Sequence, residues 1–132
     1  MTRVLLIEPD TYLARLYTEA LKQTGYKVDM ASGAQMAITM ADHNTPDLVI
    51  LEIQLAQHNG LEFLYEFRSY KEWQNVPVLL HTLVPPADFS ENIVLWNEIE
   101  LAGYLYKSRT NLGQLLRSVA ACVQPPIVTS GV

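Results

Sequence analysis

Residues 47–52 have the sequence DLVILE, in which four apolar residues stand between two acidic ones. An unbroken apolar run of this length, bounded by a proline before it, is typical of a parallel strand that is buried on both faces of its sheet. We therefore expect a central strand here, with Glu52 at its carboxyl end. In open α/β sheets, the carboxyl ends of the strands line the binding crevice.

Three further apolar runs end in the same way, on a side chain that can take part in chemistry. The runs and their end residues are 3–7 with Glu8, 76–82 with Thr82, and 104–106 with Lys107. Two carboxylates, a hydroxyl and an ammonium at one crevice would suit a phosphoryl or metal site. A fifth strand is expected over 27–31, where apolar and charged residues alternate as at the edge of a sheet.

Helical patterns separate these strands. Asp10 or Thr11 can cap a first helix, which Gly25 would end. Apolar residues at helical spacing predict further helices after Gly33, after Gly60 and over 112–123. Strands that alternate with helices through short loops form a parallel sheet covered on both faces. The expected fold class is therefore α/β, a flavodoxin-like (βα)5 doubly wound parallel sheet with strand order 2-1-3-4-5, in which Glu8 and Glu52 are neighbours.

Residues 83–102 give the least regular pattern. Pro85 and Pro86 favour an extended start, and Asp88 with Glu91 fits a capping box. The apolar run 93–96 fits a strand as well as a helix, and we expect a short or distorted helix. Residues 1–123 would then form one domain, followed by a tail or linker over 124–132.

Composition limits the classes of protein to consider. At 132 residues the chain suits one domain, and a net charge of −5 with scattered cations argues against direct nucleic-acid binding. The single Cys122 cannot form an internal disulfide, which fits a reducing cytoplasm. The sequence shows no signal peptide and no run long enough to span a membrane. Other side chains are expected to pack in the core: the methionines 30, 36 and 40, and His81 as a neutral ring.

Together these segments resemble a response-regulator receiver domain, the phosphoryl-accepting module of two-component signalling. The resemblance covers the chain from Arg3 to about Val123 and rests on five segments in order, which are 4–8, 46–52, 59–62, 76–82 and 103–107. It implies that Glu8 matches the first of two acidic magnesium ligands and that Glu52 occupies the phosphoacceptor position. It also implies that Thr82 and Tyr104 are the switch residues and that Lys107 contacts the phosphoryl oxygens.

Three positions depart from the family's pattern. Pro9 stands where the second acidic ligand would be, so that Asp10, one residue further on, is the alternative ligand if it does not cap the helix. Glu52 replaces the usual aspartate, and its carboxylate reaches one methylene further, which allows an ion pair with Lys107 and a hydrogen bond with Thr82 without phosphate. Ser108 replaces a proline that follows a cis bond. A cis Lys-Ser bond would cost about 3–4 kcal/mol, so a trans turn is expected.

We therefore expect an atypical receiver that is no enzyme, binds Mg²⁺ weakly if at all, and acts by binding a signalling protein or histidine kinase. The resemblance places that contact, or a homodimer, on the face made by the fourth helix, fifth strand and fifth helix. Three alternatives stay open: an acidic pocket that has decayed, a receiver with weak phosphoryl transfer to Glu52 or Asp10, and a small flavodoxin-like enzyme or cofactor carrier. The last is disfavoured because residues 8–12 lack a glycine-rich phosphate cradle.

Overall fold

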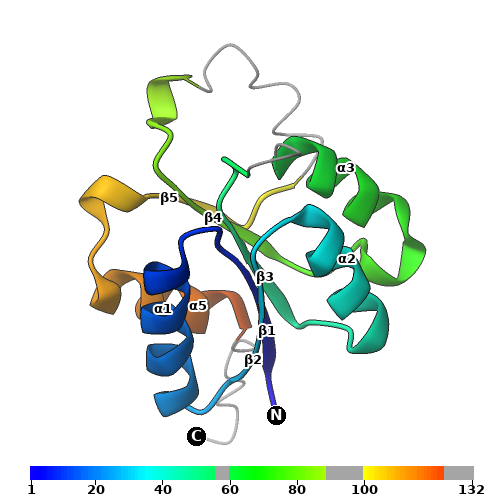
Figure 1. Ribbon diagram of the computed structural model, residues 1–132, viewed down its shortest axis with the longest axis horizontal. Helices are drawn as coiled ribbons and strands as arrows, with labels where there is room; N and C mark the ends of the chain where they lie inside the picture. Colours follow the sequence, from blue (N-terminus) through cyan, green and yellow to red (C-terminus); the bar gives the residue numbers. More distant parts are fainter. Residues whose placement is uncertain (56–59, 89–99, 124–132) are drawn as a thin grey trace, which may run out of the picture.

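The computed structural model describes residues 1–55, 60–88 and 100–123, and its strands form one five-stranded sheet (Figure 1). The strands are β1 (Arg3–Ile7), β2 (Lys27–Ala31), β3 (Leu48–Leu51), β4 (Val78–Thr82) and β5 (Gly103–Tyr106). All neighbouring strands are parallel, in the order β2-β1-β3-β4-β5. The predicted flavodoxin-like doubly wound sheet and its strand order are therefore confirmed.

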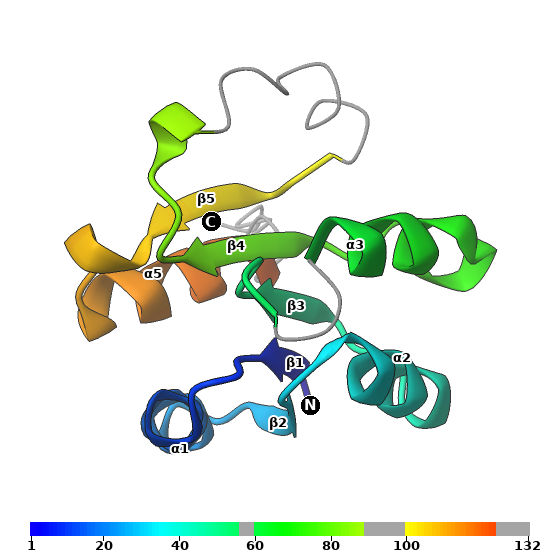
Figure 2. The ribbon, with the colours of Figure 1, turned by 45° about the horizontal axis from the view of Figure 1, so that its top comes forward.

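Helices cover both faces of the sheet. They are α1 (Thr11–Gln23), α2 (Ala34–His43), α3 (Gly60–Ser69) and α5 (Leu112–Val123), with short 3-10 helices η1 (Lys71–Trp73) and η3 (Lys107–Arg109). Figure 2 shows α1 and α5 against one face, and α2 and α3 against the other. Within the described residues, no helix is long and apolar enough to cross a membrane.

The two sides of the central strands supply two cores. Leu6 and Ile50 face α1 and α5, together with Leu21 and Leu115. Their chain neighbours in β1 and β3 point to the opposite face, as the two-residue repeat of a strand requires. All four residues of β3 are buried, which is the reason that its sequence is uniformly apolar.

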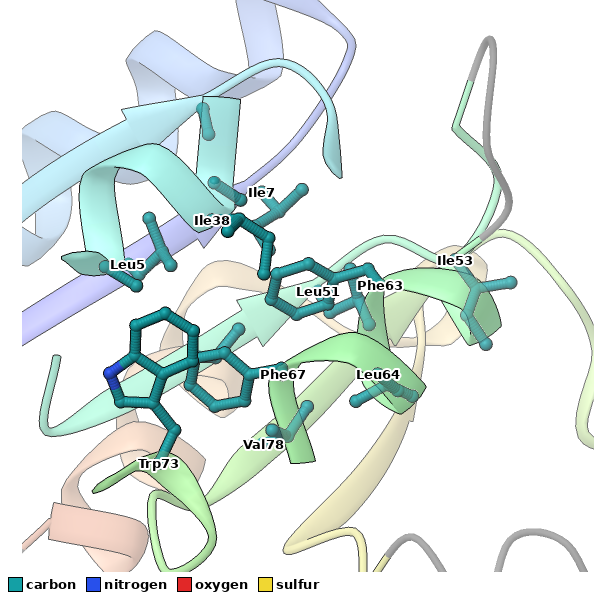
Figure 3. Close-up of a cluster of buried hydrophobic side chains, with 14 of the residues drawn as sticks. Leu5, Ile7, Ile38, Leu51, Ile53, Phe63, Leu64, Phe67, Trp73 and Val78 are labelled. Atoms are coloured by element: carbon teal, nitrogen blue, oxygen red, sulfur yellow. The ribbon is translucent and has the colours of Figure 1, made fainter. Parts of the chain in front are cut away.

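The second core contains an aromatic stack under α3 (Figure 3). The rings of Phe63 and Phe67 stack with centroids 5.3 Å apart, and Trp73 stacks on Phe67 at 5.0 Å. Trp73 is 1 % exposed and is therefore a core residue. The Arg68 side chain holds η1 in place by donating to the Trp73 carbonyl over 2.9 Å.

Short-range signals set the helix ends. Asp10 caps α1, since its carboxylate accepts a hydrogen bond from Leu13 N over 2.9 Å. Gly25 has φ = 108°, a conformation that favours glycine, and it follows α1 as predicted. Gly60 donates to the Ile53 carbonyl over 2.7 Å, and an added Cβ would lie 2.7 Å from Ile53 Cα. Glycine is thus required at the start of α3, because a side chain at position 60 would collide with the backbone of Ile53.

Two expectations from the sequence were wrong. Met30 and Met36 are not core residues, since 38 % and 46 % of their surfaces are exposed. In α2 the buried face is formed by Ala37, Ile38 and Ala41, whose small alanines bring the helix close to the sheet and turn Met36 outward. The chain after β4 is not extended throughout, because residues 86–88 form one 3-10 turn that is closed by Asp88 N on the Pro85 carbonyl.

Some sequence-based expectations fall outside the described residues. These are the Asp88–Glu91 capping box, the distorted helix expected within 83–102 and the linker expected over 124–132.

Candidate functional site

The candidate site lies where the central strands end. Ile7 and Leu51 are paired in the sheet, so Glu8 and Glu52 leave neighbouring strands side by side, and Glu52 N donates to the Ile7 carbonyl over 3.0 Å. Thr82 is the last residue of β4, and Lys107 follows β5. The four side chains are almost completely buried, with Glu8 3 %, Glu52 2 % and Thr82 0 % exposed. The sequence had predicted that these residues converge.

Lys107 bridges the two carboxylates. Its Nζ lies 2.7 Å from Glu8 Oε1 and 2.8 Å from Glu52 Oε1, and its side chain is 7 % exposed. Burial by itself would lower the pKa of Lys107, but the hydrogen bonds to Glu52 and Glu8 outweigh burial and raise it above its usual value. The predicted ion pair between Glu52 and Lys107 is confirmed, and Lys107 is a fully charged counterion to both acids.

The Glu52 carboxylate accepts four hydrogen bonds. Oε1 accepts from Lys107 Nζ at 2.8 Å and from Leu83 N at 3.0 Å. Oε2 accepts from Gln54 N at 3.1 Å and from the Thr82 hydroxyl. An ionised carboxylate offers about four lone-pair sites, so every acceptor site of Glu52 is used. Burial raises the pKa of this carboxyl, but the donors, Lys107 foremost, more than offset burial and hold it below its usual value.

A chain of hydrogen bonds runs from Glu52 to β5. The Thr82 hydroxyl donates to Glu52 and accepts from Val84 N over 3.2 Å, and the Val84 carbonyl accepts from the Tyr104 hydroxyl. The Tyr104 ring packs against the core under α3. Burial, together with the nearby Glu52 charge, raises its pKa to about 12, so Tyr104 stays a donor at neutral pH. Glu52 and Tyr104 are therefore linked through Thr82 and Val84.

His81 lies beside the site but faces the opposite side of the sheet. It is 2 % exposed, and its ring meets Tyr17 of α1 edge to face, with centroids 5.0 Å apart. Burial, with the Lys107 charge second, lowers the pKa of His81 from 6.5 to about 4. The packed neutral histidine predicted from the sequence is confirmed.

The lowered pKa predicts a share of the pH dependence of stability. Since the folded pKa lies below the unfolded value, the unfolded state binds more protons between pH 6.5 and 4, and stability falls as the pH drops through that interval. At about 1.4 kcal/mol per pH unit, His81 accounts for up to about 3 kcal/mol. Urea unfolding at pH 7 and at pH 4.5 measures the difference in free energy of unfolding between the two pH values. In the His81→Phe variant this difference should be smaller by the contribution of His81. Equal pH slopes for variant and wild type would contradict the assignment.

The residues present do not fit a magnesium ion. Glu8 and Glu52 are both engaged by Lys107, and Pro9 has no side-chain oxygen. The Asp10 carboxylate caps α1, and only its backbone N–H turns toward the site, donating to Glu8 Oε2 over 3.2 Å. No group of three metal-ligating side chains occurs among residues 1–55, 60–88 and 100–123. Of the two expected ligands, Glu8 reaches the site and Asp10 does not.

The turn after Lys107 has the expected peptide geometry. Lys107–Arg109 form the 3-10 helix η3, and the described chain contains no cis peptide bond. The Lys107–Ser108 bond is therefore trans, as predicted from the absence of a proline. The Thr110 hydroxyl closes the turn by donating to the Tyr106 carbonyl over 2.7 Å.

Several groups at the site were not predicted. The backbone N–H groups of Gln54 and Leu83 hold Glu52, and the Val84 carbonyl receives Tyr104. Backbone donors and acceptors occur at every position, so residue types give no signal for them. Tyr17 lies on the buried face of α1, and its contact with His81 had no sequence signature.

The fold and the buried acid–lysine cluster define a doubly wound α/β domain with a charged site at its strand ends, and sequence comparison identifies its family. A sequence model described as the response regulator receiver domain matches residues 4–119. The chain therefore belongs to the response-regulator receiver family, whose members act in two-component signalling with histidine kinases and partner proteins. The family predicted from the sequence is confirmed.

Individual relatives agree with this assignment. The KDP operon transcriptional regulatory protein KdpE of Escherichia coli is 34% identical over 80 residues, which are 61% of this chain and 34% of KdpE. The chain thus spans about a third of the length of that relative. The regulatory protein VanRB of Enterococcus faecalis is 36% identical over 80 residues, 61% of this chain and 35% of its own length.

Solved structures show the same fold. The non-phosphorylated HemR receiver domain of Leptospira biflexa superposes with a TM-score of 0.83 at 23% identity, covering 96% of this chain and 97% of HemR. The response regulator TrrA of Thermotoga maritima, solved with Mg²⁺ and BeF, has a TM-score of 0.77 at 26% identity, covering 92% of this chain and 99% of TrrA.

Proposed function

We propose that this chain is a receiver domain that signals without phosphorylation, by binding a partner protein. The observation that carries the proposal is the Glu52 carboxylate, whose four acceptor sites are all filled by Lys107, Leu83, Thr82 and Gln54. A carboxylate that accepts a phosphoryl group needs one oxygen free to attack and space in line with it. Glu52 offers neither without breaking at least one buried hydrogen bond.

The same contacts give Glu52 a structural role. Its longer side chain reaches the Thr82 hydroxyl and the Lys107 ammonium, the two groups that the family resemblance assigns to the phosphoryl oxygens. Through Val84, these contacts extend to Tyr104 on β5. Glu52 therefore holds the switch residues in one arrangement, and β5 and α5 belong to the face that the family resemblance assigns to partner binding. The partner is a histidine kinase or another signalling protein.

The alternative is a receiver with weak phosphoryl transfer to Glu52 or Asp10. Intact-mass spectrometry after incubation with acetyl phosphate and Mg²⁺ separates the two functions. We expect no increase in mass, because the acceptor oxygens are engaged and the metal ligands are incomplete. An increase of one phosphoryl group that disappears in Glu52→Gln or in Asp10→Asn would establish the alternative and identify the acceptor.

Magnesium itself should have little effect. We expect millimolar MgCl₂ to leave the melting temperature within error of that in KCl at the same ionic strength, because Lys107 already pairs with both carboxylates and Pro9 supplies no further ligand. Differential scanning calorimetry measures this directly. A ligand that binds only the native state must raise stability, so saturable stabilisation by Mg²⁺ but not by KCl would contradict the expectation.

The role of Glu52 in holding Tyr104 has its own test. In protein labelled with fluorotyrosine, ¹⁹F NMR reports the environment of each tyrosine ring. The resonance of Tyr104 is assigned as the one that is missing from the Tyr104→Phe variant. We expect the resonance to stay unchanged on addition of acetyl phosphate and to shift in Glu52→Ala, which removes the acceptor of Thr82. A Tyr104 resonance that is unaffected by Glu52→Ala would show that the switch is not held from the acidic site.

A further inference from the structure

The last part of the fold carries a charge opposite to that of the rest. Residues 101–123 contain Lys107, Arg109 and Arg117 and no acidic residue. Since the whole chain carries −5 and this segment carries +3, the remaining residues carry −8. Lys107 is buried between two carboxylates, so the positive charge at the surface of this segment comes from the two arginines.

Both arginines line one groove between β5 and α5. The groove has a volume of about 480 Å³. Its remaining lining residues are Leu105, Thr110, Gln114, Ser118 and Ala121. Small side chains at 118 and 121 leave the space open, and the Gln114 amide and the Ser118 hydroxyl can donate to an anionic or peptide ligand.

Neither guanidinium is neutralised within the described structure. Arg3 pairs with Asp29 at 2.9 Å, but Arg109 and Arg117 make no ion pair with a described residue. Both are exposed. Arg117 Nη1 lies over Gly113, where an added Cβ would be 3.3 Å away, so its head group lies along α5 beside the groove. Two unpaired guanidiniums at one groove of an acidic protein favour a carboxylate ligand.

The groove continues along the edge of the sheet. A second hollow of about 440 Å³ shares Leu105, Ser118 and Ala121 with it and includes Gly103 and Tyr104. β5 is the last strand of the described sheet, and its residues are half-buried, whereas those of β4 are fully buried. The trough therefore combines an apolar floor with two cations at one end.

We propose that this trough binds a short acidic segment of the partner protein, with its carboxylates on Arg109 and Arg117 and its apolar side chains over Leu105 and Ala121. The proposal rests on the proposed function, in that it names the chemistry of the partner. Tyr104 contributes to the lining of the second hollow, and its hydroxyl donates to the Val84 carbonyl, so the trough adjoins the residue that is linked to Glu52.

Two other occupants fit the charges less well. In a twofold dimer the same patch meets itself, and residues 101–123 would then set cations against cations with no acid to balance them. Nucleic acid binding depends on many phosphate contacts, and two arginines on a chain of charge −5 supply few. An acidic peptide that also carries apolar side chains can pair with both guanidiniums and pack on the apolar floor at the same time.

The test uses a fluorescein-labelled peptide of alternating glutamate and leucine, with a lysine–leucine peptide as its control. We expect saturable anisotropy with the acidic peptide only, weakened by added NaCl. In the Arg109→Glu/Arg117→Glu variant the affinity should fall at least about tenfold. The matched control is Arg15→Glu, an exposed cation on α1, which should change the affinity less than about twofold. Both variants should keep the wild-type melting temperature, because all three arginines are exposed.

Amide shifts in ¹H–¹⁵N spectra locate the peptide and should concentrate at Leu105, Thr110 and Ser118. Three outcomes would overturn the proposal: no saturable binding, an equal loss in Arg15→Glu, or shifts confined to another face. A dimer in sedimentation experiments that the double variant dissociates would assign the trough to a second copy. These results are independent of phosphorylation, since labelling by acetyl phosphate would refute the proposed function whether or not the peptide binds.

Discussion

The Lys107→Met variant should have a free energy of unfolding about 3–5 kcal/mol lower than that of the wild-type protein at pH 7. Methionine keeps most of the side-chain volume but removes the ammonium, which leaves Glu8 and Glu52 buried at 3 % and 2 % exposure without their shared cation. Urea unfolding followed by circular dichroism measures the loss. The matched control is Lys22→Met on α1, an exposed lysine, for which we expect a change within about 0.5 kcal/mol.

The contribution of Glu52 to the pH dependence of stability should differ in sign between the two proteins. In the wild type the pKa of Glu52 is lowered, so its stabilising contribution is present at neutral pH and is lost as the pH falls through the folded pKa. Without Lys107, burial dominates and raises the pKa of Glu52, so the folded variant binds the proton more tightly than the unfolded chain. Its contribution to stability should then increase as the pH falls from 7. A variant that loses stability in parallel with the wild type would show that Lys107 is not the balancing charge.

The fold was predictable because its signals are local. Buried parallel strands must be apolar at every position, so runs such as Val4–Ile7 and Leu48–Leu51 stand out from the helices around them. The carboxyl ends of parallel strands meet at one edge of the sheet. The sequence therefore predicted that Glu8, Glu52, Thr82 and Lys107 lie at one site.

The state of the site was less predictable. The sequence allowed an ion pair between Glu52 and Lys107, but it gave no sign that Lys107 also bonds Glu8 or that two backbone N–H groups complete the shell around Glu52. The sequence favoured Asp10 as a helix cap and left open a role as metal ligand. Only the orientation of its carboxylate toward Leu13 N decides between them. The prediction for Met36 was wrong because α2 mixes small and large apolar side chains. In such a helix the spacing of apolar residues defines the buried face only to within about one residue.

The second large effect concerns restoring phosphorylation. Glu52→Asp withdraws the carboxylate by one methylene, which should break its contacts with Thr82 and Leu83 N and open the space that a phosphoryl group requires. By itself the change should restore little labelling by acetyl phosphate, because Pro9 still leaves the metal site one carboxylate short. Intact-mass spectrometry with and without Mg²⁺ measures the labelled fraction.

Adding Pro9→Asp to Glu52→Asp should produce magnesium-dependent labelling that neither single change produces. The effect should be strongly non-additive, because both residues serve one transition state while Lys107 and Thr82 are already in place. The matched control, Pro9→Asn with Glu52→Asp, has nearly the same shape but lacks the second negative charge and should label poorly.

Each possible result for the single and double variants identifies what prevents phosphorylation at position 52. Efficient labelling of Glu52→Asp alone would mean that Pro9 is no obstacle and that Asp10 leaves its capping position to bind the metal, in which case Asp10→Ala should abolish it. An unlabelled double variant would mean that the site has diverged beyond these two positions, most directly at Ser108, which lies in the trans turn η3 beside Lys107. The domain would then be a protein-binding scaffold whose switch residues are held permanently by Glu52, and its regulation would depend on the partner instead of on phosphate.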